Sequence, residues 1–94
     1  NVPAHDNSGM DGYAFRHADV PAEGDATLAV IGTSFAGKPY EGTVGPGQAV
    51  RIMTGASVPP GCDTVVMQER AKAADGKVTL GSGAKKGQNI RRAG

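Results

Sequence analysis

Apolar residues in this chain occur in short alternating runs, which clusters of glycine, proline and small polar residues separate. The alternation predicts strands at 13–17, 27–31, 49–53 and 64–69, with a last short strand at 88–92. Asp75-Gly76 is a strong signal for a two-residue hairpin turn, which would pair residues near 67–73 with residues 77–80. The helix formers at 69–74 are too few for a stable helix, so this segment is also predicted as strand and turn.

The composition supports an all-β domain with one modest core. Fifteen glycines and six prolines in 94 residues favour many turns and few long helices. A chain of this length buries roughly 60–65% of the surface that it exposes when unfolded. Four aromatic residues are expected to share the core with the aliphatic residues: Tyr13, Phe15, Phe35 and Tyr40. We therefore predict a small distorted β-barrel or a bent, coiled antiparallel sheet, formed as a single domain over residues 1–94.

Charge and cysteine content limit the kinds of site that we expect. The net charge of +1 gives no general attraction to nucleic acid or to a membrane, and no apolar run approaches the roughly 20 residues that span a bilayer. Cys62 is the single cysteine, so neither an internal disulfide nor a cysteine zinc site is expected, and a reducing cytoplasm fits. Basic residues near the C-terminal end lack interleaved aromatics, which favours a solvated rim over a nucleic-acid patch: Lys85, Lys86, Arg91 and Arg92.

Two polar loops carry the candidate chemistry, and the first is the segment 6–12. It crowds two carboxylates, an amide and a hydroxyl in front of the strand at 13–17. Such residues are typical of a well-made turn, and reactive groups are also often carried on a loop that a rigid scaffold positions. Asp6 and Asp11 have the oxygen ligands that Mg2+ prefers, with turn capping as the alternative for both.

The second polar loop, 54–57, follows the predicted strand at 49–53. Thr54 and Ser57 offer hydroxyl and backbone N–H donors to an oxyanion, and an ordinary turn after a strand is the alternative. Arg51 is a candidate anion ligand, or else a solvated strand residue. His5 and His17 lack metal-ligand spacing with each other and with Cys62, so we assign them no site.

Four blocks of the sequence resemble the molybdopterin molybdotransferases, the family of MoeA and the gephyrin E-domain. Residues 6–14 read DNSGMDGYA, which is similar to the family signature DNSAMDGYA with Gly9 in place of the commoner alanine. The other blocks follow in the family's order at 34–37, 50–69 and 87–92. The resemblance covers nearly the whole chain, which looks like one β-rich domain excised from a longer, multidomain protein.

The resemblance implies a role in the last step of molybdenum cofactor synthesis, in which molybdate is inserted into adenylylated molybdopterin and AMP is released. In this family the active cleft lies between the pterin-binding domain of one subunit and the present domain of its homodimer partner. Motif matching implies catalytic roles for Asp11 and Thr54. The two loops should then lie on the same side of the domain. The remaining candidates are substrate contacts and a Mg2+ site: Ser8, Arg51 and Ser57 for substrate, and Asp11 with Asp6 for the metal.

Two other functions stay open at this point. A gephyrin-like relative would use the domain as a non-catalytic β-barrel binding or scaffold module, which binding of a partner peptide would reveal. A small β-barrel that binds nucleic acid is a further alternative, which the near-neutral charge and the missing stacking aromatics oppose.

Overall fold

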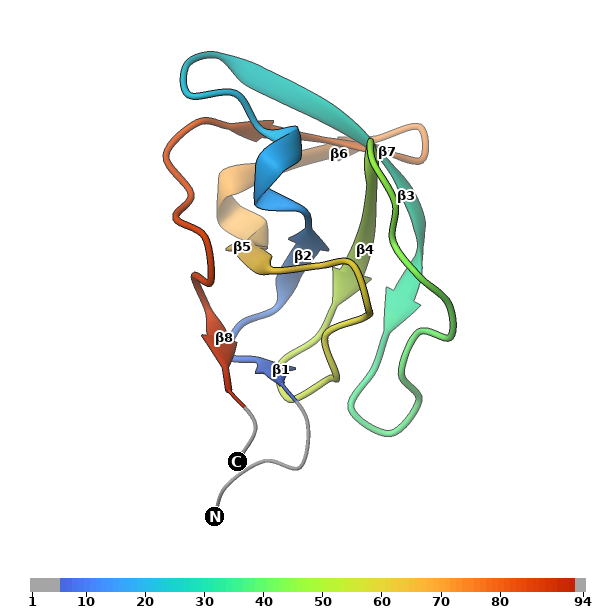
Figure 1. Cartoon of the computed structure of the whole chain (residues 1–94). Coiled ribbons are helices and arrows are strands. Elements are labelled where there is room, and N and C mark those ends of the chain that lie inside the picture. The colour runs from blue at the N-terminus through green and yellow to red at the C-terminus, as the bar shows by residue number, and fades with distance from the viewer. Residues whose placement is uncertain (1–5, 93–94) are drawn as a thin grey trace.

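The computed structural model describes residues 6–92, which form a strongly bent six-stranded sheet and a small two-stranded sheet (Figure 1). The large sheet has the order β5-β2-β4-β3-β7-β6. Its strands are β2 (Gly12–Phe15), β3 (Asp25–Ser34), β4 (Gln48–Ile52), β5 (Thr64–Met67), β6 (Ala71–Ala74) and β7 (Lys77–Gly81). The small sheet pairs β1 (Asn7–Ser8) with β8 (Ile90–Arg91). The predicted all-β class with a bent sheet is confirmed.

Two single turns of 3-10 helix, η1 (His17–Asp19) and η2 (Gln68–Arg70), follow β2 and β5. They explain why the strands predicted at 13–17 and 64–69 each end two residues early, at Phe15 and Met67. Within the described range, no helix is long and apolar enough to cross a membrane. His5, to which the sequence assigned no site, lies outside the described residues.

The hairpin predicted at Asp75-Gly76 is confirmed. Strands β6 and β7 pair antiparallel with Ala74 opposite Lys77, so the turn has two residues. Asp75 and Gly76 have φ angles of 53° and 74°, the left-handed values that a type I′ hairpin turn requires.

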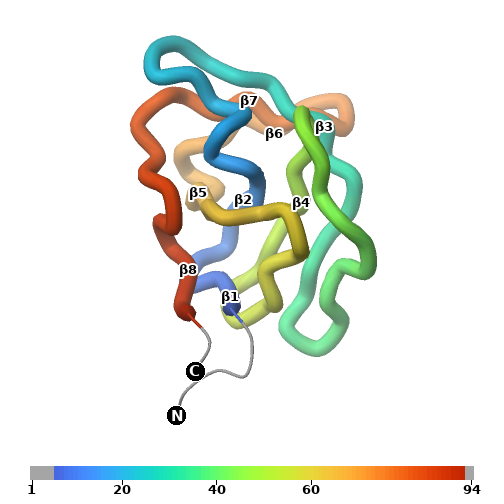
Figure 2. The backbone as a smooth tube through the Cα atoms, in the orientation of Figure 1, coloured from blue at the N-terminus to red at the C-terminus, as the bar shows by residue number. Residues whose placement is uncertain are grey.

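One strand pair differs from the antiparallel sheet that we predicted. Strands β3 and β4 pair in parallel, with a register shift between Val30 and Thr33, while every other pair among the described strands is antiparallel. A parallel pair needs a crossover of a dozen or more residues. Residues 35–47 supply that crossover by running back beside β3 (Figure 2).

The core lies inside the bend of the large sheet and continues under the small one. One buried cluster comprises Phe15, Leu28, Ala49, Val66, Val78 and Leu80. A second comprises Ala14, Ile52, Ala56 and Val65. The neighbours Ala14 and Phe15 belong to different clusters because successive side chains of a strand point to opposite faces. Strand β2 is therefore buried on both faces and firmly holds the loop in front of it.

The prediction that Phe35 belongs to the core is wrong, since its side chain is 49% exposed. Phe35 and Lys38 exchange two backbone hydrogen bonds, with N–O distances of 2.9 and 3.1 Å, across the turn Ala36-Gly37. This hairpin projects past the end of β3, at the lower right of Figure 1. Tyr40 is closer to the prediction, because it is half-buried against Gly32, where a Cβ would come within 2.4 Å of the Tyr40 ring.

Candidate active site at the Asp11–Thr54 pair

The two polar loops meet at Asp11 and Thr54. The backbone N–H and the hydroxyl of Thr54 both donate to Oδ1 of Asp11, each at 2.7 Å. These residues are 43 positions apart in the sequence. The prediction that the two loops lie on the same side of the domain is therefore confirmed.

Strand pairing brings these two residues together. Gly12 lies opposite Ile52 of β4, so Asp11 and Thr54 follow from neighbouring strands at the same end of the sheet. The backbone N–H of Gln68 donates to the Asp11 carbonyl at 3.0 Å, which fixes the loop from its other side. Ser8 exchanges further backbone hydrogen bonds with the second loop, accepting from Gly55 at 2.8 Å and donating to Ala56 at 3.0 Å.

Hydrogen bonding controls the charge of Asp11. The Thr54 hydroxyl and then the Thr54 backbone N–H hold the pKa of the Asp11 carboxyl below its ordinary value, and the charge of Arg51 adds to this effect. Desolvation of the carboxyl, a larger effect than the Arg51 charge, acts in the opposite direction. Asp11 is consequently ionised at neutral pH. Both hydrogen bonds from Thr54 reach Oδ1 and neither reaches Oδ2, and binding of a cation or a water by this carboxylate stays a prediction.

Arg51 is held close to the pair. Its guanidinium donates to the carbonyl of Gly12 at 3.0 Å and to Oε1 of Gln68 at 2.5 Å. Its guanidinium carbon lies 5.3 Å from the centre of the Tyr13 ring, within the range of a cation–π contact. Arg51 is therefore an ordered cation beside Asp11. Its role as an anion ligand stays a prediction.

The two serines have different surroundings. Ser8 is fully buried, and its hydroxyl donates to the Met10 carbonyl at 2.5 Å and accepts from the Met10 N–H at 3.2 Å. Ser8 thus closes the turn itself, which accounts for it without a substrate. Ser57 is half-buried and its carbonyl accepts from the Ser34 hydroxyl at 2.9 Å, so substrate binding by the Ser57 hydroxyl stays a prediction.

The backbone donors that we expected for an oxyanion are engaged inside the protein. The N–H groups of Thr54, Gly55 and Ala56 donate to Asp11, to the Ser8 carbonyl and to the Met53 carbonyl, respectively. The expectation of a backbone anion nest in this loop is therefore wrong for these three groups. The Thr54 hydroxyl also donates to Asp11, so anion binding by the loop stays a prediction for Ser57.

The predicted Mg2+ site has one carboxylate, Asp11, at the meeting point of the two loops. Asp6 forms an ion pair with Arg92 at 3.1 Å, and within 6–92 no three His, Cys, Asp or Glu side chains gather as a metal cluster. Mg2+ is often held by one or two carboxylates together with substrate phosphates. Mg2+ binding by Asp11, with or without Asp6, therefore stays a prediction.

Two residues that shape this site escaped the sequence analysis. Gly12 is so close to β5 that a Cβ would come within 1.9 Å of the Val66 carbonyl oxygen. A glycine inside an alternating strand pattern is the signal for such a close approach. Ser34 is fully buried and links Ser57 to Tyr40 through its hydroxyl, and nothing in the local sequence indicates this link.

The four blocks that carried the resemblance converge at this end of the domain. Blocks 6–14 and 50–69 meet at the Asp11–Thr54 pair, and Ser34 joins block 34–37 to them. Asn89, from the last block, accepts from the Gly9 N–H at 2.8 Å and donates to the Val65 carbonyl at 2.9 Å. Residues 1–94 match the model of a known family, the MoeA N-terminal region (domain I and II).

The chain belongs to this family. It is 50% identical over 95 residues to the molybdopterin molybdenumtransferase of Haemophilus influenzae, an alignment that covers 100% of this chain and 23% of the relative. Two crystal structures of the molybdopterin biosynthesis MoeA protein from Pyrococcus horikoshii resemble it with TM-scores of 0.90 and 0.87, at 30% and 31% identity. They cover 96% and 100% of this chain, which spans only 24% and 27% of theirs.

As a MoeA N-terminal region, the chain is a fragment of a protein of molybdenum cofactor biosynthesis. It spans about a quarter of the length of the relatives that it matches. The Asp11–Thr54 pair lies at the surface, with Thr54 exposed, so further parts of a cleft can approach it from outside these residues.

Proposed function

We propose that this MoeA N-terminal region forms one wall of the active cleft of a molybdopterin molybdotransferase. The enzyme inserts molybdate into adenylylated molybdopterin and releases AMP. The observation that carries this proposal is the hydrogen-bonded Asp11–Thr54 pair, because it unites the two residues that motif matching selected. Further support comes from the similarity of the chain to molybdopterin molybdenumtransferases.

The electrostatics of the pair favour one role for Asp11 over another. A general base works best with a pKa near the working pH, whereas hydrogen bonds from Thr54 lower the pKa of Asp11. Asp11 is therefore better suited to hold a cation or orient a water than to remove a proton. Its negative charge would repel molybdate directly. Mg2+ bound there would neutralise charge on the pyrophosphate of the substrate.

Thr54 and Arg51 have supporting roles in the proposed site. The Thr54 hydroxyl fixes Oδ1 of Asp11, so that Oδ2 presents a defined direction to the cleft. Arg51 keeps a positive charge beside the site, where anionic substrate groups would approach. The pterin would bind mainly to another domain of the full-length protein. The homodimer partner would supply the opposite wall of the cleft. The enzyme would work in the cytoplasm.

The test is Asp11→Asn in the full-length enzyme, with AMP release as the readout. Asparagine keeps the size of aspartate and can still accept from Thr54, so the fold should survive. We expect AMP release to fall by about 10²-fold or more, the usual size of losing a positioning or acid–base group. Asp25→Asn is the matched control, because Asp25 is exposed at the far end of β3. A fully active Asp11→Asn enzyme would show that this carboxylate is not required.

A further inference from the structure

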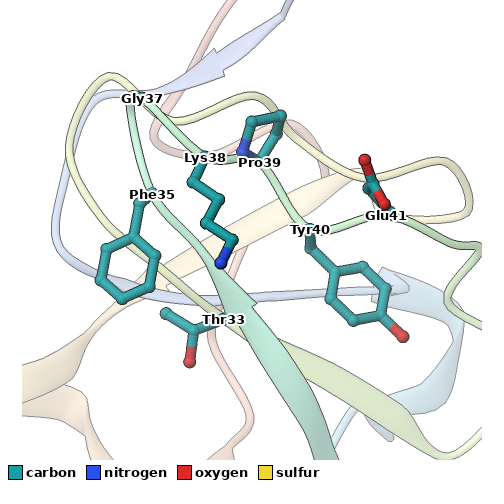
Figure 3. A pocket seen from close by; sticks show the side chains of 7 residues that line it. All are labelled: Thr33, Phe35, Gly37, Lys38, Pro39, Tyr40 and Glu41. Atoms are coloured by element: carbon teal, nitrogen blue, oxygen red, sulfur yellow. The ribbon is translucent and has the colours of Figure 1, made fainter.

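An open pocket of about 530 Å3 lies between the hairpin at the end of β3 and the segment that returns from it (Figure 3). Its walls include Thr33, Phe35, Lys38 and Tyr40. Figure 3 shows the rings of Phe35 and Tyr40 on two sides of the Lys38 side chain, whose ammonium points toward Thr33. The carboxylate of Glu41 points away from this ammonium. In the described part of the chain, no carboxylate forms an ion pair with Lys38.

Phe35 is the exposed large hydrophobic residue of the described chain, at 49%. A single exposed hydrophobic side chain is ordinary and carries no argument alone. Here it stands opposite a second aromatic wall, with a cation between the two. Two aromatic surfaces around an ammonium match a flat ring that carries negative charge.

Hydrogen bonds and close packing hold the second wall, Tyr40, in place. Tyr40 donates its backbone N–H to the Ser34 hydroxyl at 3.1 Å, and this buried hydroxyl donates to the Ser57 carbonyl at 2.9 Å. The Tyr40 ring lies over Gly32 and Gly42, where a Cβ would come within 2.4 and 3.2 Å of ring carbons. The Tyr40 wall is therefore in place before any ligand binds, which reduces the cost of ordering it.

The pocket adjoins the Asp11–Thr54 site. The Met53 N–H donates to the Ser34 carbonyl at 3.0 Å, which continues the contact of β3 with the β4 side up to the residue before Thr54. A Cβ on Gly55 would lie 3.9 Å from the Cβ of Ala36, so the hairpin turn packs beside the Thr54 loop.

From this geometry we propose that the pocket is a subsite for a fused-ring heterocycle that carries an anionic group. The ring stacks on Phe35, with Tyr40 as the second wall, and Lys38 contacts the anion as a point charge. This inference rests on the proposed function, because adenylylated molybdopterin offers two such rings, a purine and a pterin. The shared chemistry of the two rings is what the pocket recognises.

Ligand binding to the 94-residue chain, followed by amide chemical shifts in NMR, tests the subsite. The chain is suitable because both buried clusters form within it, and no buried side-chain polar atom in the described part lacks a partner. The probes are AMP and pterin-6-carboxylate, with ribose 5-phosphate as the anion that lacks a fused ring. We expect AMP or the pterin to shift residues 33–41, and the tighter of the two identifies which ring the pocket takes.

Variants separate stacking from charge. Phe35→Leu keeps an apolar side chain but removes the ring, and should weaken binding by about 5- to 150-fold, the usual range for base–aromatic stacking. Phe35→Tyr keeps the ring and should bind like the wild type. Lys38→Gln should weaken binding and reduce its dependence on salt, whereas the control Lys72→Gln, an exposed lysine of β6, should change neither.

Three results would overturn the subsite: no shift at 33–41 with either ring, equal affinity of Phe35→Leu, or ribose 5-phosphate binding as well as AMP. These results are independent of catalysis. Loss of AMP release in Asp11→Asn without ligand binding at 33–41 would refute the subsite and leave the proposed function standing. Ring binding at 33–41 together with a fully active Asp11→Asn enzyme would support the subsite and refute the proposed role of Asp11.

Discussion

Replacing Gly12 with alanine should be among the most damaging single changes in this domain. Gly12 is buried in β2 between Ile52 of β4 and Met67 of β5. An added Cβ would lie 1.9 Å from the carbonyl oxygen of Val66 and 2.8 Å from its carbon, both of them backbone atoms. Because real Cβ contacts below 3.0 Å essentially do not occur, β2 and β5 would have to separate by at least about 1 Å.

A separation of this size is larger than the hydrogen bonds between the two strands tolerate. Each backbone hydrogen bond lost costs about 0.5–1.5 kcal/mol net, and overpacking a buried site costs about 1–3 kcal/mol. We therefore expect Gly12→Ala to lower the free energy of unfolding by about 2–4 kcal/mol. That is a large share of the roughly 5–15 kcal/mol that stabilise a typical domain.

Gly9→Ala is the matched control, since it makes the same change three residues earlier in the same loop. A Cβ at Gly9 would have its closest contact at 3.4 Å, with the Asn89 carbonyl oxygen, which is ordinary van der Waals distance. Alanine also restricts the unfolded chain, so we expect this variant to be unchanged or more stable by up to about 1 kcal/mol.

Urea unfolding of the 94-residue chain, followed by circular dichroism, measures both changes by linear extrapolation. A slope that stays constant between variants shows that only stability has changed. A Gly12→Ala domain within about 0.5 kcal/mol of the wild type, a change as small as that of an ordinary surface substitution, would refute the close approach of β2 and β5. Equal losses for both variants would show that the loop, and not this contact, is what alanine disturbs.

Three further predictions concern charge, reactivity and activity. Thr54→Val should raise the pKa of Asp11 part of the way to its ordinary value, because it removes the largest lowering contact and keeps the backbone one; carbon-13 titration of the carboxyl measures this. Because the pKa of Asp11 is depressed in the folded state, the stabilisation that it brings is present above the unfolded pKa and is lost as pH falls through the folded pKa. Thr54→Val should therefore make the free energy of unfolding less sensitive to acid. Burial raises the pKa of the Cys62 thiol to about 12, so Ellman's reagent at pH 8 should react about 10³-fold more slowly with the folded than with the unfolded chain, and equal rates would contradict it. The 94-residue chain should release no measurable AMP from adenylylated molybdopterin and molybdate, because half a cleft cannot hold the reactants in register, whereas turnover would show a self-contained site.

Local sequence was sufficient to predict most of the individual strands. Alternation located the segments that became β2, β3, β4 and β5, and the Asp75-Gly76 dipeptide located the hairpin of β6 and β7. These features depend on side-chain periodicity and turn conformation over a few residues, which the chain carries wherever it lies. The same locality explains why Asp11 and Thr54 could be selected as candidates one at a time.

The contacts between distant segments were decided by the tertiary structure. The parallel pairing of β3 with β4 depends on the path of residues 35–47 around the sheet, and no local pattern specifies that path. Phe35 has the side chain of a core residue, yet it is exposed because its hairpin extends past the end of β3. Ser8 has a side chain suited to substrate binding, yet its hydroxyl closes a buried turn.

The site itself shows the division most clearly. The sequence supplied a carboxylate and a hydroxyl 43 positions apart, each with an ordinary turn as its alternative. Their shared hydrogen bonds exist because β2 pairs with β4 in the register that sets Gly12 opposite Ile52. A shift by one residue would move Asp11 away from Thr54 and turn the side chains of β2 to the other face. The local sequence thus supplied the residue types of the site, whereas its geometry came from strand register, which only the folded sheet establishes.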